Sequence, residues 1–98
     1  MYSLGLDIGG TKIAAVIMDK TGREHGRYRR DTVKNSYGDF LDNLLSFIED
    51  IKGVVQAPLA IGIALPGGIS PISGKIKNSN ILVLNGEDLK ADLHVRLG

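Results

Sequence analysis

The fold is decided near the start of the chain, by the stretch Leu4-Gly-Leu-Asp-Ile-Gly-Gly-Thr-Lys-Ile13. Apolar residues at positions 4, 6 and 8 alternate with Gly5 and Asp7, which predicts a buried strand over residues 2–7. Gly9-Gly10-Thr11-Lys12 follows, and a Gly-Gly pair between two β-rich runs is a hairpin signal. The apolar run of residues 13–18 therefore predicts the second strand of a hairpin.

A third strand is expected over residues 23–32, after a turn at residues 19–22, and it completes a three-stranded antiparallel meander. A period of two places a basic row on one face of this strand. The row fits either a basic groove or a solvated edge strand, and we favour the edge strand because charge commonly protects sheet edges from pairing. Its members are Arg23, His25, Arg27 and Arg29.

A helix should begin after Ser36, with Asp39 in the last position of a capping box. An apolar stripe at helical spacing predicts the face that packs on the core, and Gly53 predicts the end of the helix. The stripe consists of Phe40, Leu41, Leu44, Leu45, Phe47, Ile48 and Ile51.

Residues 59–65 form a nearly continuous apolar run, which is typical of a central strand buried on both faces. Strand, helix and strand in this order predict a parallel crossover, so this run should pair with the first strand. Beyond it we expect a loop over residues 66–74, a short strand at 75–77 and a helix over 88–97. The expected fold class is α/β, with a mixed sheet whose first three strands are antiparallel and with helices packed on it.

The composition is that of one small globular domain. The 98 residues are 43% hydrophobic and 23% charged, and the net charge of +1 gives no reason to expect a nucleic-acid or membrane partner. No apolar run approaches the roughly 18 residues that a membrane span needs. Cysteine is absent, which excludes a disulfide framework and a thiolate zinc site. With no secretion signal visible, we expect a cytoplasmic protein.

The turn at residues 9–12 suits a phosphate group, although it matches neither the P-loop spacing nor the dinucleotide fingerprint. Two glycines let successive N–H groups converge on an anion, while Thr11 adds a hydroxyl donor and Lys12 a mobile positive charge. Asp7, at the strand end, is suited to a hydrated Mg²⁺. A plain glycine hairpin with an aspartate cap explains the same residues, so the turn alone leaves both interpretations open.

Four motifs in order carry a more specific signal. They are the opening stretch, Gly62-Ile-Ala-Leu-Pro-Gly67, Gly74-Lys-Ile-Lys-Asn-Ser-Asn80 and Leu84-Asn-Gly-Glu-Asp-Leu89. Together they span essentially the whole chain, and they resemble the N-terminal lobe of ROK-family sugar kinases, which belong to the actin-like ATPases with a ribonuclease H-like fold. The stretch at residues 68–78 and the Leu84-Asn-Gly86 segment look most like bacterial fructokinases and N-acetylglucosamine kinases.

The resemblance implies transfer of a phosphoryl group from ATP, with Mg²⁺, to a hexose. It places Asp7 beside the metal and the phosphates, with Gly9, Gly10, Thr11 and Lys12 as the phosphate-binding turn. It assigns Gly67 and Gly68 to the floor of the sugar site, and Ser79 and Asn80 to the sugar hydroxyls. For this last pair the alternative is a turn whose side chains satisfy the local backbone.

Some family features have no counterpart in the 98 residues. The catalytic aspartate of the family's Asn-Asp-x-Asn segment is expected beyond Gly98, and the family's zinc site and second lobe are missing. The expectation is therefore one domain, residues 1–98, corresponding to the N-terminal lobe and inactive by itself. One alternative is a ROK-type sugar-responsive transcriptional regulator, but the residues before Leu4 leave no room for the helix-turn-helix of such a protein. The other alternative is a self-associating remnant. We expect a homo-oligomer, because surfaces meant for the missing lobe would be apolar.

Overall fold

The computed structural model describes residues 2–56, 59–65 and 67–97. No helix within these ranges is long and apolar enough to cross a membrane. The elements in chain order are β1 (Tyr2–Ile8), β2 (Lys12–Met18), β3 (Glu24–Asp31), α1 (Tyr37–Val55), β4 (Leu59–Ala64), β5 (Gly68–Ile69), β6 (Ile76–Lys77), the short 3-10 helix η1 (Leu82–Leu84) and α2 (Leu89–Leu97).

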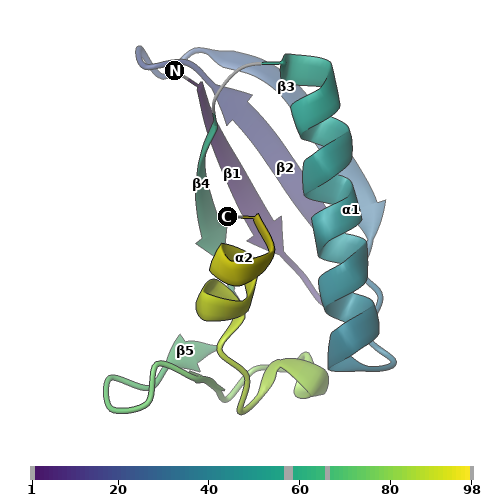
Figure 1. Ribbon diagram of the computed structural model, residues 1–98, viewed down its shortest axis with the longest axis vertical. Coiled ribbons are helices and arrows are strands. Elements are labelled where there is room, and N and C mark those ends of the chain that lie inside the picture. Colours follow the sequence, from purple (N-terminus) through teal and green to yellow (C-terminus); the bar gives the residue numbers. More distant parts are fainter. Residues whose placement is uncertain (1, 57–58, 66, 98) are drawn as a thin grey trace.

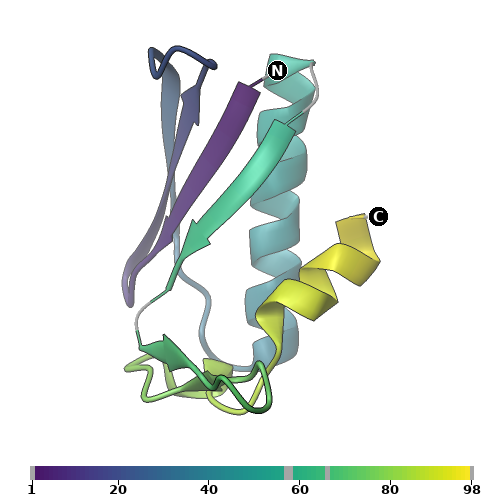
Figure 2. The ribbon, with the colours of Figure 1, turned by 90° about the vertical axis from the view of Figure 1, so that its left-hand side faces the viewer.

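The main sheet has the strand order β3-β2-β1-β4 (Figure 1). β1 and β2 are antiparallel, β2 and β3 are antiparallel, and β4 runs parallel to β1. The α/β class, the antiparallel meander and the pairing of residues 59–65 with the first strand are all confirmed. β5 and β6 form a second, two-stranded antiparallel sheet, which lies beyond the ends of β1 and β4 (Figure 2).

The core lies between one face of the main sheet and the helices. All seven stripe positions of α1 are buried, as their spacing predicts. Ser36 caps this helix, since its hydroxyl accepts a hydrogen bond from the Asp39 N–H at 3.1 Å. α2 adds Leu89 and Leu93 to the same core, and the sheet contributes Leu4, Leu6, Ile8, Ile13, Ala15 and Ile17.

β4 corrects one prediction, because it is not a central strand buried on both faces. It stands at the edge of the main sheet, and alternate residues along it are exposed. The exposed ones, Ala60, Gly62 and Ala64, are small, so leaving them in water sacrifices little apolar burial. The apolar run reflects small side chains on one face rather than two buried faces. β3, at the other edge, is the charged edge strand that the sequence predicts.

The predicted end of α1 at Gly53 is also wrong. The helix continues to Val55, and Gln56 ends it in the left-handed conformation with its N–H donating to the Lys52 carbonyl at 2.9 Å. A β-carbon placed on Gly53 would meet nothing within 4 Å, so this glycine is an ordinary exposed helix position. The loop expected at residues 66–74 is interrupted by β5, and its first residue, Pro66, lies outside the described residues.

Candidate functional site

The first hairpin closes through a tight glycine turn at residues 9–11. The Gly9 N–H donates to the Lys12 carbonyl at 2.9 Å. A β-carbon on Gly9 would lie 2.9 Å from that same carbonyl oxygen, which is too close for any other residue without a shift of the turn. The turn geometry therefore accounts for the first glycine.

The carbonyl groups of the turn are held by the segment that follows β3. The Thr32 hydroxyl donates to the Gly9 carbonyl at 2.7 Å, and the Thr32 N–H donates to the Thr11 carbonyl at 2.9 Å. The Lys34 ammonium donates to the Gly10 carbonyl at 2.7 Å. The N–H groups of Gly10 and Thr11 have no hydrogen-bond acceptor among the described residues. Two adjacent N–H groups are therefore available as donors to an anion.

Asp7 is the penultimate residue of β1, separated from this turn by Ile8. It is exposed on the sheet face opposite α1, in register with Ala14 of β2 and Ala64 of β4. No group of three or more His, Cys, Asp or Glu side chains suited to a metal occurs in the described part of the chain. A single carboxylate still fits Mg²⁺, which takes one or two carboxylates together with waters and phosphate oxygens.

Lys12 is not free, contrary to the mobile charge that the sequence suggests. Its ammonium forms an ion pair with Asp31, the residue opposite it on β3. The cation in contact with the turn is Lys34, which the sequence analysis missed. Thr32 was missed as well. Both approach the turn from more than twenty residues away, so no local motif signals them.

The loops after β4 and β6 meet beside the turn. Gly67 has a φ of 100°, and a β-carbon there would lie 2.7 Å from the Lys77 carbonyl oxygen and 2.9 Å from the Ser79 nitrogen. Gly68 continues into β5, opposite Lys77. Asn80 is exposed, and its Nδ2 would lie 3.8 Å from a β-carbon on Gly10. The structure thus brings Gly67, Gly68, Ser79 and Asn80 to the same end of the sheet as the turn.

The Ser79 side chain satisfies the local backbone, which is the alternative that the sequence analysis gives for the Ser79-Asn80 pair. Its side chain is buried, and its hydroxyl accepts the Ile81 N–H at 3.1 Å. The Asn85 amide holds the backbone of Ser79 on both sides, accepting from its N–H at 2.9 Å and donating to its carbonyl at 3.1 Å. Asn80 is left as the more accessible of the two predicted sugar ligands.

A hollow of about 200 Å³ lies elsewhere, between β4, the β5–β6 sheet and α2. None of its lining residues belongs to the glycine turn. The lining is mostly aliphatic, so it offers few groups that recognise a phosphate or a sugar hydroxyl. Its lining residues are Ile61, Ile63, Leu65, Ile69, Gly74, Ile76, Leu89 and Lys90.

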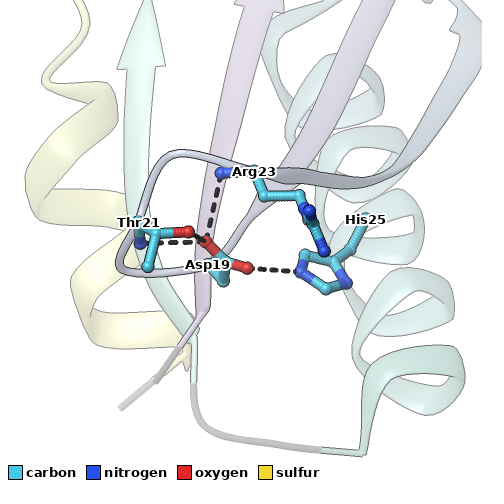
Figure 3. Close-up of polar contacts among 4 residues, drawn as sticks. All are labelled: Asp19, Thr21, Arg23 and His25. Carbon is cyan, nitrogen blue, oxygen red and sulfur yellow. Dashed lines mark hydrogen bonds and ion pairs between the residues drawn. The ribbon is translucent and has the colours of Figure 1, made fainter.

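A second polar cluster lies at the opposite end of the first hairpin strands, in the β2–β3 turn (Figure 3). Asp19 accepts from the Thr21 hydroxyl, from the N–H groups of Thr21 and Arg23, and from His25 Nε2 at 2.7 Å. These hydrogen bonds, the Thr21 hydroxyl foremost, hold the pKa of Asp19 well below its usual range. The cluster stabilises a turn and is remote from the glycine turn.

The strand order and the hairpin first define the class of fold, an α/β lobe built on a mixed four-stranded sheet. A protein-family model described as "ROK family" matches residues 3–98, so the chain belongs to the ROK family.

Several of the proteins that this chain is similar to are sugar kinases. N-acetyl-D-glucosamine kinase of Salmonella newport (strain SL254) is 36% identical over 93 residues, which cover 95% of this chain and 31% of that protein. The inorganic polyphosphate/ATP-glucomannokinase of Arthrobacter sp. strain KM is 30% identical with a TM-score of 0.75, over 99% of this chain and 41% of that one. A ROK glucokinase from Streptomyces griseus, solved with glucose and AMPPNP, shares the fold at a TM-score of 0.83 and 24% identity, over 100% of this chain and 31% of that one. The chain spans about a third of the length of the N-acetyl-D-glucosamine kinases that it matches.

Proposed function

We propose that this chain is the N-terminal lobe of a sugar kinase that transfers the γ-phosphoryl group of ATP to a hexose hydroxyl. The observation that carries the proposal is the position of Asn80 beside the glycine turn. Phosphoryl transfer needs the phosphate and the accepting hydroxyl held side by side, and two free N–H groups next to an exposed amide provide donors for both.

In this proposal the turn from Gly9 to Lys12 binds the phosphates, with the free N–H groups of Gly10 and Thr11 as the first donors. ATP supplies the phosphoryl group, and Asp7 binds the Mg²⁺ that neutralises its charge. Asn80, supported by Ser79, binds sugar hydroxyls. Gly67 and Gly68 shape the floor of the sugar site, because the close packing of Gly67 on Ser79 fixes the distance between the two loops.

The substrate is proposed to be a hexose of the N-acetylglucosamine or fructose type. The similarity to N-acetyl-D-glucosamine kinases favours N-acetylglucosamine. The similarity to a glucokinase and a glucomannokinase adds glucose and mannose to the sugars that should be tested. The proposed location is the cytoplasm, where ATP is available. Homo-oligomers are proposed through β4, an edge strand without a charged residue, whereas β3 is protected by charge and by a register shift at its pairing with β2. Light scattering on the purified chain tests the oligomeric state.

We propose that the proton acceptor for the sugar hydroxyl lies outside these 98 residues, so that the chain alone does not turn over. Of the eleven acidic side chains in the sequence, only Asp7 and Glu87 lack a hydrogen-bond or ion-pair partner among the described residues. Asp7 is assigned to the metal, and Glu87, in the segment between η1 and α2, is the remaining candidate that the assay must exclude. A coupled assay for ADP with N-acetylglucosamine, glucose, mannose and fructose should therefore show no turnover. Turnover that Asp7→Ala or Glu87→Ala abolishes would contradict this part of the proposal.

Binding tests the site without requiring turnover. In ¹⁵N-resolved NMR spectra, Mg·ATP should shift the amides of Gly10 and Thr11 most, and a hexose should shift the Asn80 side-chain amide. Asn80→Ala should weaken hexose binding about tenfold or more, because an unpaired substrate hydroxyl is costly. Ser3→Ala, which removes an exposed polar group at the far end of β1, is the matched control and should bind normally. Hexose binding unaffected by Asn80→Ala would reject the sugar site.

A further inference from the structure

The segment after β3 contacts three successive carbonyl groups of the glycine turn. Thr32 binds the carbonyls of Gly9 and Thr11, through its hydroxyl and its N–H, and Lys34 binds the carbonyl of Gly10. The Thr32 hydroxyl is partly buried, whereas Lys34 is exposed. The turn is therefore braced from one side by side chains that no motif of the phosphate turn includes.

These contacts determine where the free N–H groups point. In a planar trans peptide the carbonyl and the N–H point in opposite directions. The Gly9 carbonyl shares its peptide with the Gly10 N–H, and the Gly10 carbonyl shares its peptide with the Thr11 N–H. With both carbonyls held by Thr32 and Lys34, both N–H groups face away from those side chains. Glycine residues have more backbone freedom than others, and these contacts restrain that freedom in the turn.

We propose that Thr32 is a positioning residue of the phosphate turn and that Lys34 polarises its central peptide. Thr32 restrains the Gly9–Gly10 peptide with the N–H side open to the anion. The Lys34 ammonium withdraws electron density through the Gly10 carbonyl, which makes the Thr11 N–H a stronger donor. The inference rests on the proposed function, since it concerns the binding of the phosphates of a nucleotide by that turn.

Lys34, rather than Lys12, supplies the positive charge that the sequence suggests beside the turn. The Lys12 ammonium is paired with Asp31, whose carboxylate offsets its charge. The Lys34 ammonium contacts a neutral carbonyl, so its full charge remains beside the turn. Lys34 should accordingly contribute more to anion binding than Lys12.

The first experiment needs no ligand. Carbonyl ¹³C chemical shifts report whether a carbonyl accepts a hydrogen bond. In Thr32→Val the Gly9 carbonyl resonance should move to the position of a carbonyl without a protein donor, and Thr32→Ser should restore it. Lys34→Met should move the Gly10 resonance in the same way. Resonances that stay in place in both variants would overturn the inference whatever the protein binds. Thermal unfolding of each variant establishes that it is folded.

The second experiment measures the affinity for Mg·ATP and for inorganic tripolyphosphate by the same NMR titration. Thr32→Val should weaken binding about five- to tenfold, with Thr32→Ser near the wild type, because one hydrogen bond to the turn is lost and regained. Lys34→Met should weaken binding more than Lys12→Met. Lys20→Met removes the same charge in the distant β2–β3 turn, and it should change the affinity less than twofold.

The outcomes separate the two claims. If the wild type binds and Thr32→Val binds equally well, the positioning role is wrong and the proposed function stands. If the wild type gives no shift at Gly10 or Thr11 with either probe, the phosphate turn itself is rejected, and the positioning inference with it. A loss in Lys20→Met equal to that in Lys34→Met would show that net charge, rather than the contact with the Gly10 carbonyl, governs binding.

Discussion

Gly67 is the residue whose backbone the candidate site depends on most. Its φ of 100° lies in the region that favours glycine, and a β-carbon would collide with Lys77 and Ser79. Gly67→Ala should therefore lower the free energy of unfolding by roughly 1–3 kcal/mol. Gly53→Ala is the matched control, because an open helix position should gain up to about 1 kcal/mol from the change. Urea denaturation measures both, and equal effects of the two variants would contradict this role of Gly67.

Asp19 makes the stability of the β2–β3 turn depend on pH. Its pKa is lowered in the folded chain, first by the Thr21 hydroxyl and then by His25. A lowered folded pKa gives stability that is present above the unfolded pKa, near 4, and is lost as the pH falls through the folded value. Between pH 5 and pH 2 the wild type should therefore lose more stability than Asp19→Asn. Parallel losses in urea titrations at both pH values would show that the turn does not depend on this carboxylate.

Near the candidate site, the sequence predicted the β1–β2 turn correctly because the signal for a turn is local. The glycine turn and the neighbouring Asp7 lie within six residues, and their spacing alone predicts a turn suited to an anion. Sequence reasoning failed for Lys34 and Thr32, because contacts across more than twenty residues depend on where the segment after β3 is placed by the sheet. The sequence also suggested a free charge on Lys12, because its ion-pair partner Asp31 is recognised only once the register of β2 and β3 is known.

Among the elements, α1 and α2 are joined by polar contacts at their edges. The Tyr37 hydroxyl donates to Asp92 Oδ2 at 2.6 Å, and Arg96 pairs with Asp42 at 3.3 Å. Partial burial, with help from the Asp92 carboxylate, raises the pKa of Tyr37 above its usual range. The hydroxyl thus stays protonated, and its contribution is lost only as the pH rises through the raised folded pKa.

Tyr37→Phe should lower the free energy of unfolding by about 1 kcal/mol, because it leaves a partly buried carboxylate without its donor. Amide hydrogen exchange should rise in α2 more than in the main sheet, since α2 has few other polar contacts with α1. Asp92→Asn retains an acceptor for the hydroxyl and should be milder. Uniform exchange over the whole chain in Tyr37→Phe would contradict a local role.

Periodicity explains what could be foreseen about these elements. The seven apolar positions of α1 recur at helical spacing, and all seven are buried, because a single amphipathic face has only one way to meet the sheet. The apolar run of β4 has no comparable periodicity that would show which face is buried. Small residues such as Ala60 and Gly62 are apolar in composition but cost little when exposed, so the run could not distinguish an edge strand from a central one.

For the whole molecule, the proposed function requires that a small α/β lobe bring an anion-binding turn and a sugar-binding amide together at one end of its main sheet. That end is formed by the β1–β2 turn, the loop after β4 and the loop after β6, which the two views of the ribbon place together below the sheet (Figures 1 and 2). The exposed face of β3, with Arg27 and Arg29, is the competing place for an anion.

The most direct measurement is a crystal structure of this chain with Mg²⁺, a non-hydrolysable ATP analogue and N-acetylglucosamine. We expect phosphate oxygens within hydrogen-bond distance of the Gly10 and Thr11 N–H groups, Mg²⁺ near the Asp7 carboxylate, and a sugar hydroxyl at Asn80. Phosphates bound on the β3 face at Arg27 and Arg29, with the glycine turn empty, would contradict the proposed function.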